Sequence, residues 1–270
     1  MMTKRRNAFS VFSMFAVAMV MLFSAGCKEE VIDPRDTTYT LKVKDVLGVA
    51  GTVTFTETSS STATIDITMT GVPAGNHPAQ LCMNSAIEGG PVVVVLNPVD
   101  ANGKSSTTVS NMSYSTLIDY NGYIQVIKSN EEPNVILAMG DIGGNVITNI
   151  NKSYPLSTVG TYGVTGNALL EKRLNGNTLM TITVTGLLEG NFYPATMNLG
   201  SIESIGGGPV TLTLGYINGT TGIGYTNIKK LDSGVACTYD NLLVYDGYIN
   251  IYQSIDASGI VICHGNIGSN

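Results

Sequence analysis

The fold is decided by one stretch of sequence, GNHPAQLCMNSAIEGGP at residues 75–91. The stretch returns in altered form as GNFYPATMN at residues 190–198, and its closing GGP returns at residues 207–209. A chain of 270 residues has room for two domains of ordinary size, about 100–150 residues each. The chain is therefore predicted to be a tandem repeat of one domain.

Each copy carries the alternation that is typical of a half-buried strand. Apolar and polar residues alternate in TIDITMT at residues 64–70 and in MTITVT at residues 180–185. Glycine-containing turns follow directly, at residues 71–76 and 186–191. Seven or eight such short strands in each copy predict an all-β protein, two tandem Greek-key β-sandwich or flattened barrel domains.

Two short segments break this alternation at matching places. SYSTLI at residues 113–118 and TYDNLL at residues 238–243 each begin with a residue that favours the helix N-cap, so each is predicted to form a single helical turn. The predicted domains are residues 38–148 and 152–270, joined by a link within residues 146–153.

The N-terminus has the features of an export signal. Lys4, Arg5 and Arg6 precede an uncharged run at residues 7–26, which ends in small residues before Cys27. Residues 1–26 are predicted to be a lipoprotein signal peptide, with Cys27 lipidated. The alternative is an uncleaved anchor, because the apolar run is long enough to span a bilayer.

The residues after Cys27 suggest a destination. Residues 27–37 are polar and predict a tether, and Lys28-Glu29-Glu30 resembles a short signal that directs lipoproteins to the cell surface in some Gram-negative bacteria. The predicted location is the cell envelope, lipid-anchored in the outer membrane and exposed at the surface.

The charge of the chain excludes one class of partner. It has 14 basic and 20 acidic residues, and residues 1–26 hold three of the basic residues and none of the acidic ones, which leaves a net charge of −9. No nucleic acid is expected as a partner, because such proteins carry a basic footprint. Membrane attachment is expected through the lipid alone.

The order of the repeated motifs resembles a known family. Glu88-Gly89-Gly90-Pro91 is followed by an Asn/Asp-Gly-Tyr strand at residues 121–123 and 246–248 and by a closing Gly-Asp/Asn-Ile-Gly at residues 140–143 and 265–268. This order resembles the CHRD domain, named for chordin, over residues 38–145 and 154–270. The resemblance implies a fold similar to that of copper-zinc superoxide dismutase.

Bacterial members of that family usually carry Tyr-Pro-Ala-His-x-His in the stretch that corresponds to residues 75–91. Positions two apart on a strand face the same side, so the resemblance implies that such paired histidines could hold one ion. The corresponding positions here are occupied by His77, Gln80 and Cys82 in the first copy and by Tyr193, Thr196 and Asn198 in the second. The paired histidines are absent, and no metal or cofactor is expected.

No other pattern predicts catalysis. The two histidines, His77 in a turn and His264 on a strand, belong to different copies, and the sequence contains neither a Gly-x-Ser-x-Gly elbow nor a phosphate-binding glycine loop. Thirteen tyrosines could form a glycan-stacking surface, but tyrosine is also a favoured strand residue. Tyr123 and Tyr248 share one repeat position, which indicates a role in the fold.

Three cysteines remain once Cys27 is assigned to lipid. Cys237 and Cys263 align with apolar residues of the first copy, so they are expected to lie inside the second copy, either as a disulfide or as two buried thiols. Cys82 would then be unpaired.

The sequence therefore predicts a non-enzymatic exported lipoprotein, a tandem CHRD-like module that serves in surface interaction or in a structural role. Its partner would be an unidentified protein or glycan. Two alternatives stay open, a metal-dependent enzyme of the superoxide dismutase type and a protein that binds a glycan or another small ligand.

Overall fold

The computed structural model of the chain describes residues 35–204, 207–257 and 259–270. The predicted signal peptide, Cys27 and residues 27–34 of the predicted tether lie outside these residues. No helix in the described part of the chain is long and apolar enough to cross a membrane.

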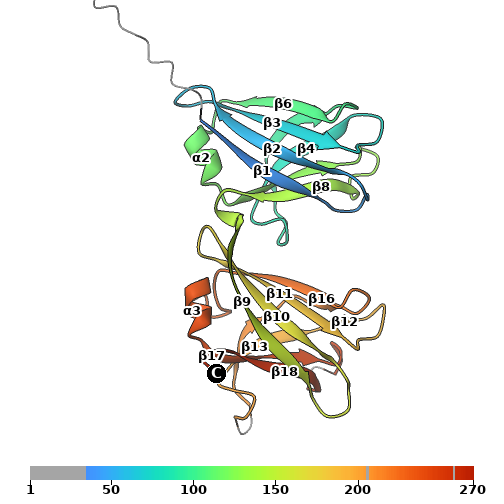
Figure 1. The fold of residues 1–270 in the computed structure, drawn as a ribbon, viewed down its shortest axis with the longest axis vertical. Coiled ribbons are helices and arrows are strands. Elements are labelled where there is room, and N and C mark those ends of the chain that lie inside the picture. Colours follow the sequence, from blue (N-terminus) through green and yellow to red (C-terminus); the bar gives the residue numbers. More distant parts are fainter. Residues whose placement is uncertain (1–34, 205–206, 258) are drawn as a thin grey trace, which may run out of the picture. The chain divides into compact units, whose positions relative to one another are not determined.

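The described residues form two antiparallel sheets with short helical turns, as predicted for an all-β protein (Figure 1). The first sheet has the strand order β5-β4-β7-β8-β1-β2-β3-β6. Its strands are β1 (Asp36–Val43), β2 (Ala50–Glu57), β3 (Ala63–Thr70), β4 (His77–Met83), β5 (Val92–Val99), β6 (Lys104–Val109), β7 (Gly122–Ile127) and β8 (Ile136–Ile142).

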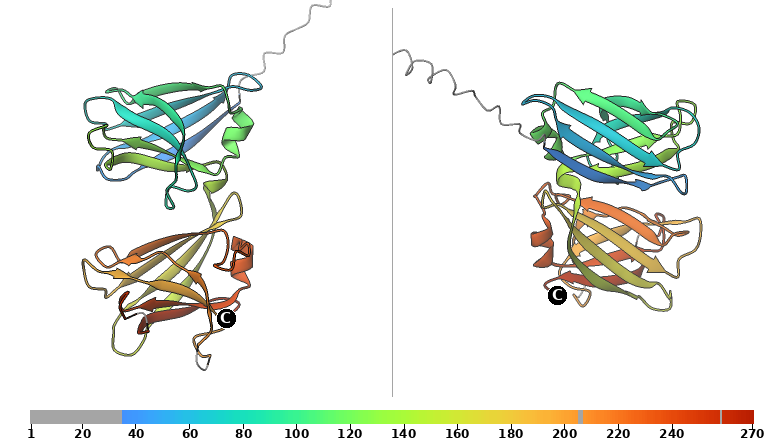
Figure 2. Two further views of the ribbon diagram at one scale, coloured as in Figure 1. Left: turned by 180° about the vertical axis from the view of Figure 1, so that it is seen from behind. Right: turned by 45° about the horizontal axis from the view of Figure 1, so that its top comes forward.

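The two edges of the first sheet meet. The Asn97 backbone N–H on β5 donates to Thr107 Oγ1 on β6 (2.8 Å), and Ser105 Oγ donates to the Asn97 carbonyl (2.6 Å). The sheet therefore curls into a barrel-like shape around its apolar face (Figures 1 and 2).

The second sheet repeats this order with two additions. Its order is β12-β15-β16-β11-β10-β9-β18-β17-β13-β14. Its strands are β9 (Ile147–Thr158), β10 (Thr165–Arg173), β11 (Thr178–Thr185), β12 (Phe192–Tyr193), β13 (Ala195–Leu199), β14 (Val210–Thr213), β15 (Ile217–Asn218), β16 (Ile223–Ile228), β17 (Asp246–Tyr252) and β18 (Val261–Gly268).

A proline interrupts strand pairing at the same place in both copies. Pro78 interrupts the register of β4 between His77 and Ala79, and Pro194 at the equivalent place separates β12 from β13. Proline has no N–H to donate to a neighbouring strand, so pairing fails at this position in both copies. In the second sheet β12 then pairs with β15, which also pairs with β16.

The alternation predicted from the sequence is present in both cores. The apolar residues of β3 and β11 are buried and their threonine neighbours are more exposed: Ile65, Ile67 and Met69 on β3, and Met180, Ile182 and Val184 on β11. The buried residues form two separate clusters, one from Leu41 to Ile142 and one from Tyr154 to Ile267. Each sheet therefore wraps its own apolar core.

Both predicted helical turns are confirmed. The first is α2 (Tyr114–Ile118), where the Ser113 side chain accepts a hydrogen bond from the Thr116 N–H. The second is α3 (Tyr239–Leu243), where Thr238 and Asn241 form a capping box.

The structure revises the limits of the tether and the link. β1 begins at Asp36, which pairs with Thr56, so the first strand starts two residues before Thr38. Residues 146–153, expected as a link, lie mostly in β9, which begins at Ile147 and pairs with β10. The chain therefore passes from the first sheet to the second through the short 3-10 helix η1 (Gly143–Asn145) and the start of β9.

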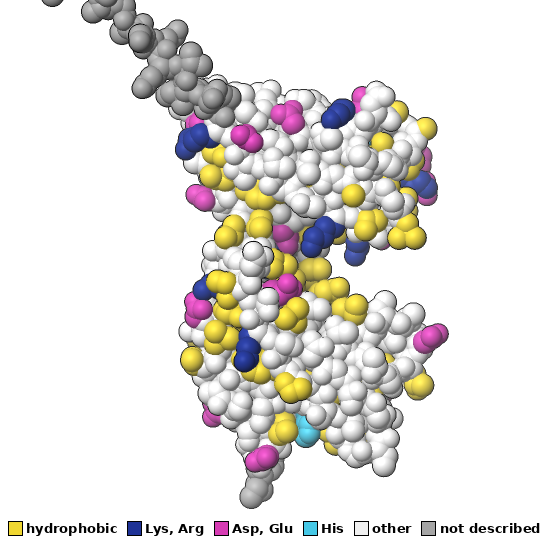
Figure 3. Space-filling view, in the orientation of Figure 1, with side chains coloured by type: hydrophobic (Ala, Val, Ile, Leu, Met, Phe, Trp, Pro, Cys, Tyr) yellow, Lys and Arg dark blue, Asp and Glu magenta, His cyan; other side chains and the backbone are white. Residues whose placement is uncertain are grey.

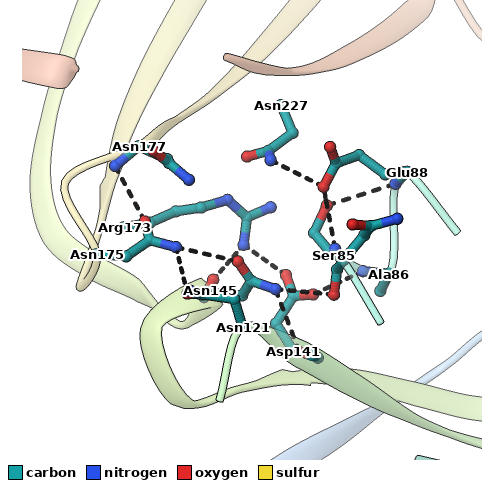
Figure 4. A network of polar contacts seen from close by, with 12 residues as sticks. Ser85, Ala86, Glu88, Asn121, Asp141, Asn145, Arg173, Asn175, Asn177 and Asn227 are labelled. Atoms are coloured by element: carbon teal, nitrogen blue, oxygen red, sulfur yellow. Dashed lines mark hydrogen bonds and ion pairs between the residues drawn. The ribbon is translucent and has the colours of Figure 1, made fainter. Parts of the chain in front are cut away.

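Polar contacts join the end of the first sheet to the β10–β11 hairpin (Figure 4). Arg173, which is 0% exposed, donates from Nη1 to Asp141 Oδ2 (2.7 Å) and to the Asn145 carbonyl. Asn175 donates from its backbone N–H to the Gly144 carbonyl (2.9 Å) and from Nδ2 to Asn121 Oδ1 (2.7 Å). We call these contacts the junction.

Glu88, which precedes the repeated Gly-Gly-Pro of the first copy, belongs to the junction as well. Its carboxylate accepts from Ser85 in its own loop, from Lys229 Nζ (2.9 Å) and from Asn227 Nδ2 (2.9 Å) on the second sheet's side. Burial opposes ionisation of Glu88, but the hydrogen bonds from Lys229 and Ser85 outweigh it and lower the pKa of Glu88. The carboxylate is thus held in its charged form, which these donors require.

We expect Asp141→Asn to destabilise the protein by about 3–5 kcal/mol, because it leaves the buried Arg173 guanidinium without its counter-charge. Urea unfolding of the chain from Lys28 would measure the loss. The matched control is Glu57→Gln, which removes the acid from a surface pair with Arg35 (2.7 Å) and should have a much smaller effect. Equal losses in the two variants would contradict a special role for the buried pair.

Candidate functional site

In the first copy, the side chains at the family-motif positions form hydrogen bonds with nearby segments of the chain. His77 is buried, and its ring nitrogens face the Lys128 carbonyl (2.6 Å, Nδ1) and the Pro73 carbonyl (3.0 Å, Nε2). Gln80 Oε1 accepts a hydrogen bond from Gln125 Nε2 (2.9 Å). His77 thus ties the preceding turn to the end of β7, and Gln80 links β4 to β7.

The second copy uses its motif positions in the same way. The Tyr193 hydroxyl accepts from the Leu188 backbone N–H (2.9 Å), so Tyr193 holds its turn as His77 holds the turn at Pro73. Thr196 Oγ1 donates to Asn198 Oδ1 (2.6 Å), which confirms that positions two apart face the same side.

The repeated Gly-Gly-Pro segment has a structural explanation. The Tyr248 hydroxyl accepts from the Gly208 N–H (2.9 Å), and a Cβ at Gly208 would lie 1.6 Å from the Leu199 carbonyl oxygen. In the first copy a Cβ at Gly90 would lie 2.3 Å from the Met83 carbonyl oxygen. Only glycine fits so close to another backbone, so these glycines seat the loop on its sheet.

Tyr123 occupies the position of Tyr248 in the first copy. Burial is the largest influence on its hydroxyl and, together with the neighbouring Cys82, raises the pKa of Tyr123 to about 12 despite a hydrogen bond from the Gly90 backbone. The two tyrosines therefore hold equivalent loops, in agreement with a role in the fold.

Metal ligands do not gather in the part of the chain that the structure describes. Within residues 35–204, 207–257 and 259–270, no group of three or more His, Cys, Asp and Glu side chains is placed to hold an ion. His264 lies on β18, opposite Asn250 of β17, and burial lowers its pKa.

The three remaining cysteines are buried and unbridged. Cys237 and Cys263 stand as two separate thiols, the second of the two arrangements considered from the sequence, and Cys82 is likewise free. Burial raises the pKa of Cys82 and of Cys237, and it raises the pKa of Cys263 to about 11. Such thiols are poor nucleophiles, because the thiolate is the reactive form.

An open groove of about 700 Å³ lies at one end of the second sheet. It is the end opposite α3, because β17 starts beside that helix and finishes at Tyr252, next to the groove (Figure 1). Three turns line the groove: the β9–β10 turn at Tyr162, the β11–β12 turn at residues 186–188 and 190–191, and the β17–β18 turn at residues 253–257. Its volume is within the usual range for small-ligand sites.

Large apolar side chains are exposed in this groove. Tyr162 is 45% exposed, Phe192 56%, Ile255 60% and Leu188 71%. Polar side chains share the lining, among them the amides of Asn191 and Gln253 and the carboxylate of Asp256. Sequence reasoning missed this site, because its residues come from three separate turns. The available signal was Phe192, which interrupts the alignment with the first copy.

The equivalent end of the first sheet has a different character. Its β7–β8 turn carries the ion pair Lys128–Glu132 (2.7 Å). The corresponding β17–β18 turn of the second copy carries Ile255 instead. The turn before β4 has Pro73 where the second copy has the exposed Leu188. The two copies thus share a fold but differ in chemistry at this end.

We expect all three thiols of the folded chain from Lys28 to react with iodoacetamide far more slowly than an exposed cysteine at pH 8, because each is buried and its thiolate is disfavoured. Mass spectrometry after timed labelling would count the modified thiols. The same protein unfolded in urea without reductant is the control, and all three thiols should then react. Rapid labelling of the folded chain, or a disulfide in the unfolded one, would contradict the arrangement.

No protein-family model, curated protein or solved structure matches this chain. The resemblance to the CHRD domain, which depends on the order of the repeated motifs, stays a prediction.

Proposed function

We propose that this chain is an exported, lipid-anchored binding module without catalytic activity, built from two CHRD-like Greek-key β-barrels in tandem. The observation that carries the proposal is the groove of the second sheet, where large apolar side chains stay exposed beside a β11–β12 turn that hydrogen bonds hold in place. Exposed apolar groups gathered in a concave site favour a ligand, since covering them releases water.

The contacts of the motif residues support a role without catalysis. At the positions where the family places paired histidines, Gln80 is bonded to Gln125, and Thr196 and Asn198 are bonded to each other. Cys82 is buried, and burial raises its pKa. These side chains are hydrogen-bonded within the sheets or buried, so they give no support to an inherited dismutase activity.

The N-terminal pattern supports export. The basic residues, the uncharged run and the small residues before Cys27 together resemble a lipoprotein signal, and the net charge of −9 after residue 26 offers no electrostatic hold on anionic lipid. The acyl chains on Cys27 would then be the membrane attachment.

We expect an alkyne fatty acid fed to expressing cells to label the wild-type chain and not Cys27→Ser, because the thiol is the acceptor of the lipid. Gel fluorescence after click coupling would compare the two. Equal labelling of both would refute the anchor while leaving the groove untouched.

We expect the chain from Lys28 to bind a neutral solvatochromic dye, Nile red, at about one site per chain, because the groove offers an apolar surface of suitable size. Ile255→Asp and Leu188→Asp should each weaken binding, which a fluorescence titration would measure. Leu47→Asp is the matched control. Leu47 lies in the β1–β2 turn at the position that corresponds to Tyr162 in the second copy. It is 92% exposed and lies outside the groove. Binding that the groove variants leave unchanged, or no binding at all, would contradict the proposal.

A further inference from the structure

We infer that the groove at the end of the second sheet binds a neutral glycan; this inference rests on the proposed binding function and names its ligand class. Four features of the described residues carry it: exposed rings, exposed amides, the absence of basic residues in the lining, and a β11–β12 turn that hydrogen bonds within the chain hold in place.

Two aromatic rings are presented to solvent from separate segments of the chain. Tyr162 precedes β10, and Phe192 opens β12. The C–H face of a sugar ring is apolar and flat enough to cover an aromatic ring, whose face carries partial negative charge. Phe192 has no counterpart in the first copy, so this ring was added where the repeat departs from its own pattern.

Planar polar groups line the same groove. Asn191, Gln253 and Asp256 line the groove and are exposed. An amide offers a donor and an acceptor together, and a carboxylate offers two acceptors, which suits neighbouring hydroxyl groups that both donate and accept. A purely hydrocarbon ligand would cover these groups without giving them partners, at a cost in binding free energy.

The charge of the lining selects against anions. Asp256 is the one acid among the lining residues, and no Lys, Arg or His is among them. A phosphate, a sulfate or a sugar acid would find no cation and would meet a carboxylate. Charged side chains are also sparse on the face of the molecule that Figure 3 shows. A neutral sugar avoids this repulsion.

One of the three turns that line the groove, the β11–β12 turn, is held by hydrogen bonds within the chain. The Gly190 N–H donates to Thr220 Oγ1 (3.0 Å), and the Gly219 N–H donates to the Asn191 carbonyl (2.8 Å). Tyr193 adds its bond to Leu188, and a Cβ at Gly219 would lie 2.2 Å from the Leu188 carbonyl oxygen. The turn that carries Leu188 and leads to Phe192 is thus fixed by its contacts, so a ligand would meet a preformed surface.

Binding to a panel of neutral and acidic oligosaccharides would test the inference, with saturation-transfer NMR on the chain from Lys28 at millimolar sugar. We expect transfer to at least one neutral oligosaccharide and none to the acidic ones. Phe192→Ser should weaken binding about tenfold or more by removing a stacking ring. Leu47→Ser, the matched control outside the groove, should bind as the wild type does. A tenfold rise in NaCl should leave the affinity unchanged, because no ion pair is involved.

Several outcomes would overturn the inference. Transfer only to acidic sugars, loss of binding in salt, equal binding by Phe192→Ser, or binding to a peptide library in place of every neutral sugar would each do so. The Nile red titration separates this failure from that of the proposed function. Dye binding at the groove with no neutral glycan bound would refute the glycan and keep the binding module, whereas failure of both would refute both.

Discussion

A proline that cannot donate a hydrogen bond stands in the fourth strand region of each copy, and much of the structure depends on it. At Pro78 the strand keeps its partner but shifts its register, whereas at Pro194 the strand divides. The residue before each proline is buried and bonded to the preceding turn, through an imidazole at His77 and through a phenol at Tyr193. The missing N–H thus marks the place where pairing is interrupted in each sheet and, in the second copy, separates the short strand β12, which carries Phe192, from β13.

Local patterns in the sequence predicted the local structure well. Alternation fixed which residues of β3 and β11 are buried, and Ser113 and Thr238 marked both helical turns, because the period of a strand and the needs of a helix N-terminus are properties of short segments. The match of Cys263 with an apolar residue also placed that thiol inside the core.

Contacts between segments that are distant in the chain could not be predicted from local sequence patterns. Arg173 follows Glu171 and Lys172 at the end of a hairpin strand, and nothing near it in the chain indicates that Asp141 and the Asn145 carbonyl complete its surroundings. The groove escaped notice for the same reason, since the turns that form it are brought together only when the sheet curls. Tyr162 and Ile255, taken singly, look like ordinary exposed residues of a turn.

The strand that joins the two copies, β9, affects how the chain resists a pulling force. Residues 151–156 of β9 pair continuously with β10, and Ile147 pairs with Arg173 beyond a shift in register, so the chain enters the core that begins at Tyr154 along a paired strand. Tension entering at Ile147 acts along the strand, across hydrogen bonds that lie perpendicular to it. Several of these bonds must shear together before β9 can leave the sheet, whereas a hairpin pulled apart from its end opens one bond at a time. A chain held by its N-terminus and pulled through a ligand on the second sheet would therefore resist the load at its joint, without any covalent crosslink.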